Sequence, residues 1–144
     1  MTWQTYIDDH LVPAGFMYAA IVGHDASTWA NTKDFQVLDA ETKILVSLLT
    51  GEKSFDEIST TGFHVAGQKY TMTRYEIDDD DGGAAFLQGR CKEEGKSAQG
   101  VIIMCTAQSL IVGVHDPKYS NGASFGKANT DIGRVADYIM EAGC

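Results

Sequence analysis

The sequence is poor in cysteine, proline and positive charge, and it contains no long hydrophobic run. Its 3 cysteines (Cys91, Cys105 and Cys144) are widely spaced and form no CxxC pair, which favours free thiols in a reducing compartment over a disulfide framework or a zinc site. The longest apolar stretches, at residues 101–105 and 110–112, have the length of strands and are too short to cross a bilayer. The first residues lack the basic and apolar regions of a secretory signal. We therefore expect a soluble cytoplasmic protein.

The 11 basic residues are outnumbered by 20 acidic ones, and a net charge of −9 argues against binding to nucleic acid. Motifs of hydrolases, zinc proteases, nucleotide-binding loops and dinucleotide-binding folds are absent. The pattern therefore predicts no enzyme, cofactor or metal site. The four histidines are not at ligand spacing, and we expect surface or turn positions for all of them: His10, His24, His64 and His115.

Two further features have simpler structural interpretations. Cys91 lies between Arg90 and Lys92, which can lower the pKa of a thiol, but a free cysteine at a basic strand end is the simpler interpretation. The run Asp78–Asp81 lacks the alternating spacing and the closing Glu of an EF-hand. We expect it to be a solvated acidic loop.

What the sequence does contain is enough apolar residues, 44% of 144, to form the core of one domain over residues 1–144. Apolar spacing predicts a helix at 2–12, ended by Pro13, and another at about 39–50 with Ile44, Leu45, Leu48 and Leu49 on its buried face. Strands are expected at 19–22, 28–30, 62–65, 69–75, 85–90, 100–105 and 110–114, and a last helix at about 129–141 is expected to bury Ile132, Val135, Ala136 and Ile139. Short connections between these strands predict an α+β fold with one antiparallel sheet and helices packed on it.

Four aromatic side chains come from segments that the predicted fold can bring together: Trp3, Tyr6, Trp29 and Tyr138. If the two terminal helices lie side by side over the sheet, the rings form a platform suited to polyproline II peptides. Tryptophan N–H and tyrosine O–H groups would then bond the carbonyls that a proline helix leaves unpaired. The alternative is that these rings are ordinary core residues. This is the simpler interpretation for Tyr138, but it suits Trp3 less well, because a tryptophan in the first turn of a short helix has little core to enter.

Five of the 11 basic residues fall between positions 69 and 96, namely Lys69, Arg74, Arg90, Lys92 and Lys96. Strand alternation would place Met72 on the same face as Arg74 and Tyr70. Such a mixed basic and apolar patch favours an acidic protein partner or an anionic head group. A solvated strand face explains the composition equally well.

Four segments carry a resemblance to one family: WQTYIDDHL at 3–11, AAIVGHD at 19–25 with Ser27 and Trp29, Gly62 with AGQKY at 66–70, and RVADYIME at 134–141. Together they resemble the profilin family of actin-monomer-binding proteins. The first is similar to the family's amino-terminal signature W-x-x-Y-[IV]-D-x-x-L and the second to its A-A-I-[IV]-G-x-D-x-S-x-W hairpin. The third resembles a further family segment, and the last resembles the carboxy-terminal helix of plant and protist members.

The resemblance implies an antiparallel sheet of six or seven strands, with the terminal helices on one face and a shorter helix on the other. It implies a non-enzymatic cytoskeletal regulator, associated with the actin cytoskeleton in the cytoplasm, that binds actin one to one, influences its nucleotide exchange and docks proline-rich formin-like factors. By position, the polyproline groove would comprise Trp3, Tyr6, Trp29 and Tyr138. The actin face would comprise Lys69, Met72, Arg74, Arg90, Lys92, Gly126 and Asn129, and phosphoinositide head groups would contact Lys69, Arg90 and Lys92.

Two other classes of function remain open at this stage. A small sheet domain could bind a metabolite or lipid in a pocket lined by the aromatic residues, and it would not respond to proline peptides. An enzyme based on Cys91 is the third class, and alkylation of that thiol would test it.

Overall fold

A computed structural model describes residues 3–77, 85–93, 99–116, 118 and 125–143. Seven strands form one sheet in the spatial order β2-β1-β7-β6-β5-β4-β3, and each neighbouring pair is antiparallel. Their bounds are Tyr18–Gly23 (β1), Thr28–Asn31 (β2), Phe63–Val65 (β3), Gln68–Glu76 (β4), Ala85–Cys91 (β5), Gly100–Cys105 (β6) and Ser109–His115 (β7). Each predicted strand is present within two residues of its expected ends, so the predicted antiparallel sheet is confirmed.

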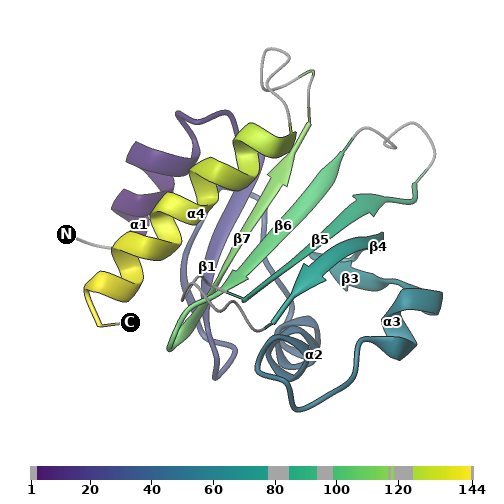
Figure 1. The fold of residues 1–144 in the computed structure, drawn as a ribbon. Coiled ribbons are helices and arrows are strands. Elements are labelled where there is room, and N and C mark those ends of the chain that lie inside the picture. Colours follow the sequence, from purple (N-terminus) through teal and green to yellow (C-terminus); the bar gives the residue numbers. More distant parts are fainter. Residues whose placement is uncertain (1–2, 78–84, 94–98, 117, 119–124, 144) are drawn as a thin grey trace.

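Helices cover both faces of the sheet (Figure 1). The amino-terminal helix consists of an α-turn, α1 (Trp3–Tyr6), that continues as a π-helix, η1 (Ile7–Leu11), and it lies beside the carboxy-terminal helix α4 (Phe125–Glu141). These helices and one face of the sheet enclose an apolar cluster that includes Ile7, Leu11 and Ile132. Helices α2 (Asp39–Leu49) and α3 (Asp56–Thr61) cover the opposite face and enclose the second cluster. The predicted arrangement of terminal helices on one face is therefore confirmed.

The stripe predicted for the last helix is buried throughout, since Ile132, Val135, Ala136 and Ile139 all lie in the core. The helix begins at Phe125, one turn before the predicted start at about 129. Within the described residues, we find no helix that combines the length and the apolar character needed to cross a membrane.

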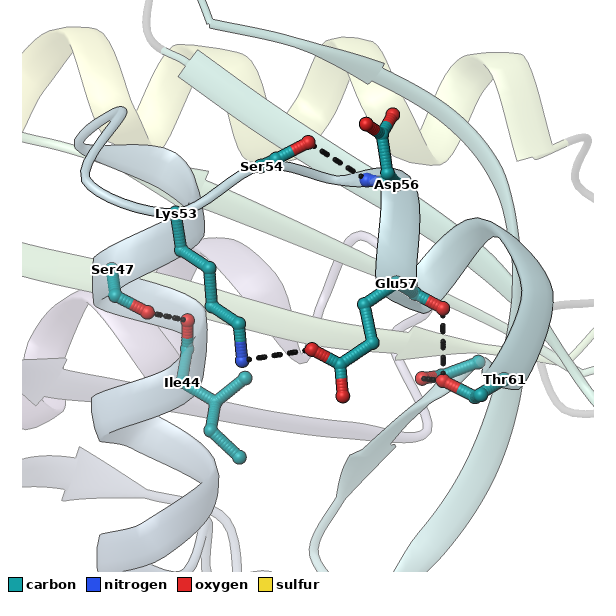
Figure 2. Close-up of polar contacts among 8 residues, drawn as sticks. Ile44, Ser47, Lys53, Ser54, Asp56, Glu57 and Thr61 are labelled. Atoms are coloured by element: carbon teal, nitrogen blue, oxygen red, sulfur yellow. Dashed lines mark hydrogen bonds and ion pairs between the residues drawn. The ribbon is translucent and has the colours of Figure 1, made fainter.

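The face of α2 differs from the prediction at one position. Leu45, Leu48 and Leu49 are buried, but Ile44 is 44% exposed and lies beside α3 (Figure 2). Because buried positions on a helix must recur every three or four residues, a stripe centred on Leu45 and Leu48 leaves Ile44 at its edge.

Helix α3 was not predicted, because it is short and places a single side chain, Ile58, in the core. Polar contacts define it instead (Figure 2). Ser54 Oγ accepts a hydrogen bond from the Asp56 N–H at 3.1 Å, and Lys53 Nζ lies 3.3 Å from Glu57 Oε2. These local side-chain contacts give a helix that apolar periodicity cannot detect.

The cysteines and one histidine complete the comparison with the expected positions. Cys91 and Cys105 are free thiols, whereas Cys144, Lys96 and the run Asp78–Asp81 lie outside the described residues. The expected surface or turn position is wrong for His115, which is buried at the end of β7 where it pairs with Gly100 on β6. Strand β7 extends one residue beyond the predicted end at 114, and every residue of this inner strand is buried, His115 included.

Glu41 connects α2 by hydrogen bonds to the tight turn between β3 and β4. Its carboxylate accepts hydrogen bonds from three backbone N–H groups, those of Leu38 (2.9 Å), Ala66 (2.7 Å) and Gly67 (2.8 Å). Ala66 and Gly67 both have positive φ, so their N–H groups point to one side and meet the carboxylate.

We therefore expect Glu41→Ala to lower the free energy of unfolding by about 1–2 kcal/mol, because it leaves three partly buried backbone donors without their acceptor. Urea unfolding monitored by circular dichroism measures the effect. Asp39→Ala is the matched control, since Asp39 is exposed and lies 3.9 Å from Lys43, and we expect a loss below about 1 kcal/mol. Equal losses for the two variants would contradict the role of Glu41.

Candidate functional site

A continuous row of rings runs from β2 across the amino-terminal helix to α4. The Trp29 and Trp3 centroids are 4.5 Å apart, and those of Trp3 and Tyr6 are 5.8 Å apart. The row continues from Tyr6 to His10 at 6.0 Å and from His10 to Tyr138 on α4 at 5.8 Å. The structure thus brings together all four aromatic residues that the sequence singled out.

His10 is the member of the row that sequence reasoning missed, because its ring was expected at a surface or turn position. A signal was available, since His10 follows Tyr6 by four residues and therefore lies above it on the same helix face. Its ring fills the space between Tyr6 and Tyr138. The row is consequently one continuous surface that joins the two terminal helices.

The rings are accessible rather than buried. Trp3, Tyr6 and Trp29 are half-buried against the core, and Tyr138 is 46% exposed, so the simpler core interpretation of Tyr138 is wrong. Among the described residues, the Trp3 indole N–H and the hydroxyl groups of Tyr6 and Tyr138 have no hydrogen-bond partner. The surface therefore combines flat apolar rings with unpaired donors at their edges.

Trp29 differs from its neighbours in this respect. Its Nε1–H donates to Ser27 Oγ at 3.2 Å, and the Ser27 hydroxyl donates to Asp25 Oδ1 at 2.5 Å. The hydrogen bonds from Ser27 hold the pKa of the exposed Asp25 carboxyl below its usual value. The expectation that both tryptophan N–H groups are available to a ligand is therefore wrong for Trp29, whose N–H is used to orient its own ring.

Gly23 and Gln4 both position the Trp29 end of this surface. A Cβ at Gly23 would lie 2.9 Å from Trp29 Nε1 and 2.6 Å from Asp25 Oδ1, so the turn closes on the indole only because residue 23 has no side chain. Gln4 joins the helix to β2, because its Nε2 donates to the Asn31 carbonyl at 3.1 Å. This bond sets the distance between Trp3 and Trp29.

The predicted basic patch lies on the sheet face that carries α4. In the register of β4 and β5, Thr71 pairs with Arg90 and Arg74 pairs with Gln88. Arg74 lies over the Phe86 ring, with its guanidinium carbon 5.2 Å from the ring centroid. Its Nη2 is 3.8 Å from Glu76 Oε2. Lys69 and Lys92 also lie on this face. Side chains alternate along a strand, and their respective neighbours Tyr70 and Cys91 are buried on the other face.

Met72 does not share this face, and the prediction that groups it with Arg74 is wrong. A β-bulge lies between Met72 and Arg74, so two residues of β4 occupy one position opposite β5. Met72 therefore packs with Tyr70 against the cluster under α2, while Arg74 turns to the α4 side. A bulge shifts the alternation by one residue, and strand periodicity alone does not reveal it.

The first turn of α4 lies next to this basic face. Gln88 Nε2 on β5 donates to Asn129 Oδ1 at 2.6 Å, and Gly126 is exposed one turn earlier. The hydrogen bond fixes the start of the helix against the strands. Six of the seven residues predicted for a protein partner thus lie on one side of the sheet, on β4, on or directly after β5, and on α4.

The two thiols that the structure describes, Cys91 and Cys105, offer little for catalysis. Cys91 is buried, and its Sγ accepts a hydrogen bond from Gln68 Nε2 at 2.7 Å. Burial raises the pKa of Cys105 to about 11, which keeps that thiol protonated at neutral pH. Reactive cysteines require an exposed, electropositive environment, which neither residue has.

Comparison with known proteins matches the profilin family over residues 1–144. Among solved structures, Acanthamoeba castellanii profilin IA is 32% identical, with a TM-score of 0.76 over 99% of this chain and 100% of that one. Mouse profilin IIa in complex with a double repeat from the FH1 domain of mDia1 is 23% identical, with a TM-score of 0.75 over 99% of each chain. LokiProfilin2 in complex with rabbit actin is 17% identical, with a TM-score of 0.62 over 94% of this chain and 92% of that one. The chain therefore belongs to the profilin family, whose members bind actin and are not enzymes.

Proposed function

We propose that this protein docks proline-rich segments on the ring row Trp29–Trp3–Tyr6–His10–Tyr138, at the β2 edge of the sheet, and binds monomeric actin one to one toward the other edge, on β4, β5 and the start of α4. The observation that carries the first activity is the row itself, with its unpaired donors. A polyproline II helix has no internal hydrogen bonds, so its carbonyls accept from such donors while its pyrrolidine rings stack on the aromatic faces. The complex of mouse profilin IIa with an FH1 repeat supports this assignment.

Titration with a proline decamer tests the groove directly. The chain has 2 tryptophans, and both belong to the row, so intrinsic tryptophan fluorescence reports on this surface without a competing signal. We expect a saturable change. The absence of any change in folded protein would overturn the groove assignment and leave actin binding to be tested alone.

For actin, we propose the face formed by Lys69, Arg74, Arg90 and Lys92 together with Gly126 and Asn129. The basic side chains are exposed on an otherwise acidic protein, which favours an acidic partner surface. The LokiProfilin2 complex with rabbit actin supports the assignment. Met72 points to the other face of the sheet, so we do not expect it to contact a partner that covers this one.

Binding to one conformation of actin would change its nucleotide exchange, because a ligand shifts an equilibrium only through different affinities for the two states. The second site would bring this actin close to filament ends by raising its effective concentration near a proline-rich, formin-like factor. Both proposed steps would act at the actin cytoskeleton.

Reversal of charge on the basic face is expected to weaken actin binding at least about tenfold for Arg74→Glu combined with Lys92→Glu. Lys43→Glu combined with Lys53→Glu makes the same change in net charge from exposed positions under the opposite face, on α2 and just before α3, and we expect little effect. Sedimentation or fluorescence anisotropy with labelled actin monomers measures both. Unchanged affinity in the first double variant would contradict the proposed face.

We also propose that Lys69, Arg90 and Lys92 bind phosphoinositide head groups, since strand register gathers these three charges on one face. Binding to phosphoinositide-containing vesicles would then compete with actin. Simultaneous binding of actin and vesicles would argue against a shared surface.

A further inference from the structure

A polar cavity of about 150 Å³ lies away from both proposed binding faces. Its walls include Tyr18 on β1 and Tyr70 on β4. These strands are four places apart in the sheet, or about 19 Å if the sheet were flat. The curl of the sheet therefore brings them to one cavity, on the side covered by α2.

The Tyr70 side chain brings an unsatisfied hydroxyl group to this cavity. Tyr70 is 2% exposed, and its hydroxyl has no hydrogen-bond partner among the described residues. No fully shielded side-chain nitrogen or oxygen in that part of the chain lacks a partner, so the hydroxyl retains some access, and the cavity provides it. Buried hydroxyl groups are nearly always paired with protein, water or a ligand.

Apart from the tyrosine hydroxyls, the polar side chains around the cavity present acceptors rather than free donors. The Gln68 amide N–H groups are used by Cys91 Sγ at 2.7 Å and Gln99 Oε1 at 3.4 Å. The Gln99 amide donates in turn to Asp116 Oδ2 at 3.2 Å. The Gln68 side-chain oxygen and the Asp34 carboxylate remain as acceptors in the described structure, and Asp34 is the charged residue of the lining.

Two carboxylates, those of Glu41 and Glu93, act on Tyr70 in addition to Asp34 in the lining. Burial raises the pKa of Tyr70, and the nearby Cys91, Glu93 and Glu41 raise it further, so the phenol is neutral at physiological pH. The Tyr18 ring stacks on Phe35 with centroids 5.3 Å apart, which adds an aromatic wall. Acceptors, carboxylates and aromatic rings together favour a cation that donates hydrogen bonds.

We propose that this cavity binds an alkylammonium group, which donates hydrogen bonds to the Tyr70 hydroxyl oxygen and to Asp34. The volume corresponds to about five water molecules, which is enough for a primary amine on a short carbon chain. The chain would lie along the Tyr18 and Phe35 rings. The group is supplied by a free amine or by the end of a lysine side chain.

Isotope-labelled full-length protein, titrated with n-butylammonium chloride and followed by NMR, tests this proposal. We expect saturable shifts at Tyr18, Phe35 and Tyr70. Binding should be about tenfold weaker in Tyr70→Phe, which removes the hydroxyl acceptor, and in Asp34→Asn, which removes the negative charge. Saturable binding of n-butylammonium supports a free amine as the source. Saturable binding restricted to Nα-acetyl-lysine N-methylamide supports a lysine side chain.

Matched controls make a negative result informative. The neutral isostere n-butanol should not bind, and equal binding of butanol and the amine would overturn the proposal, as would the absence of saturable shifts with both amines. Tyr70→Phe preserves the ring, and its folding is checked by retention on poly-L-proline, whose proposed site lies on the other face of the sheet. If the unsubstituted protein is not retained on poly-L-proline, the folding of the variant is checked by its thermal unfolding instead.

Discussion

Trp3→Ala is expected to abolish retention of the protein on poly-L-proline and to weaken binding of a proline decamer by about 100-fold. Trp3 stands in the middle of the row, 4.5 Å from the Trp29 ring and 5.8 Å from the Tyr6 ring. Its removal divides the surface and deletes an unpaired N–H donor. Affinity chromatography measures retention, and the remaining tryptophan, Trp29, reports binding by fluorescence.

Two further variants separate the possible causes of this loss. Trp3→Phe keeps an aromatic face but lacks the N–H, so an intermediate affinity would assign part of the binding energy to the hydrogen bond. Tyr75→Ala removes an aromatic side chain that is 45% exposed and stacks on Phe55, away from the row, and retention should be unchanged. Loss of both polyproline and actin binding in folded Trp3→Ala protein would contradict the separation of the two faces.

Gly113→Ala is expected to lower the free energy of unfolding by about 2–3 kcal/mol. A Cβ at this position of β7 would lie 2.6 Å from Phe16 Cε1 and 3.2 Å from Ile132 Cδ1, both in the core. Because protein cores are packed as densely as organic crystals, the Phe16 ring has no free volume to enter. Denaturant unfolding measures this change, provided that the slope of the unfolding free energy against denaturant concentration is the same in both proteins.

Gly133→Ala is the matched control, because the same methyl group is added where there is room. The nearest atom to the new Cβ would be Met104 Cε at 3.8 Å, and the position lies within α4. Alanine is the better helix former, so we expect a gain of about 0.5–1 kcal/mol. A similar loss in both variants would show that close packing around Phe16 is not the cause.

Local pattern was sufficient for most of the fold. The strands at 85–91, 100–105 and 109–115 were predictable because each is a short apolar run with turn residues at its ends. The stripe of α4, from Ile132 to Ile139, was predictable because burial along a helix repeats with the helical period. Helix α3 has neither signal and was missed, since side-chain hydrogen bonds to the backbone, such as that of Ser54, define it.

The candidate site was only partly predictable from the sequence. The four rings could be named from residue type and the expected packing of the terminal helices, but their distances, the insertion of His10 and the use of the Trp29 N–H by Ser27 depend on how those elements dock. Likewise, the bulge after Met72 reverses which side chains face α4.

The sequence by itself determined the order and type of most elements, because a strand or an amphipathic helix is encoded by neighbouring residues. Only the tertiary structure decided which side chains meet, because contacts between distant segments depend on sheet curl, register and helix docking. The cavity at Tyr70 shows this most clearly, since residues 18 and 70 share its walls although four strand positions separate them.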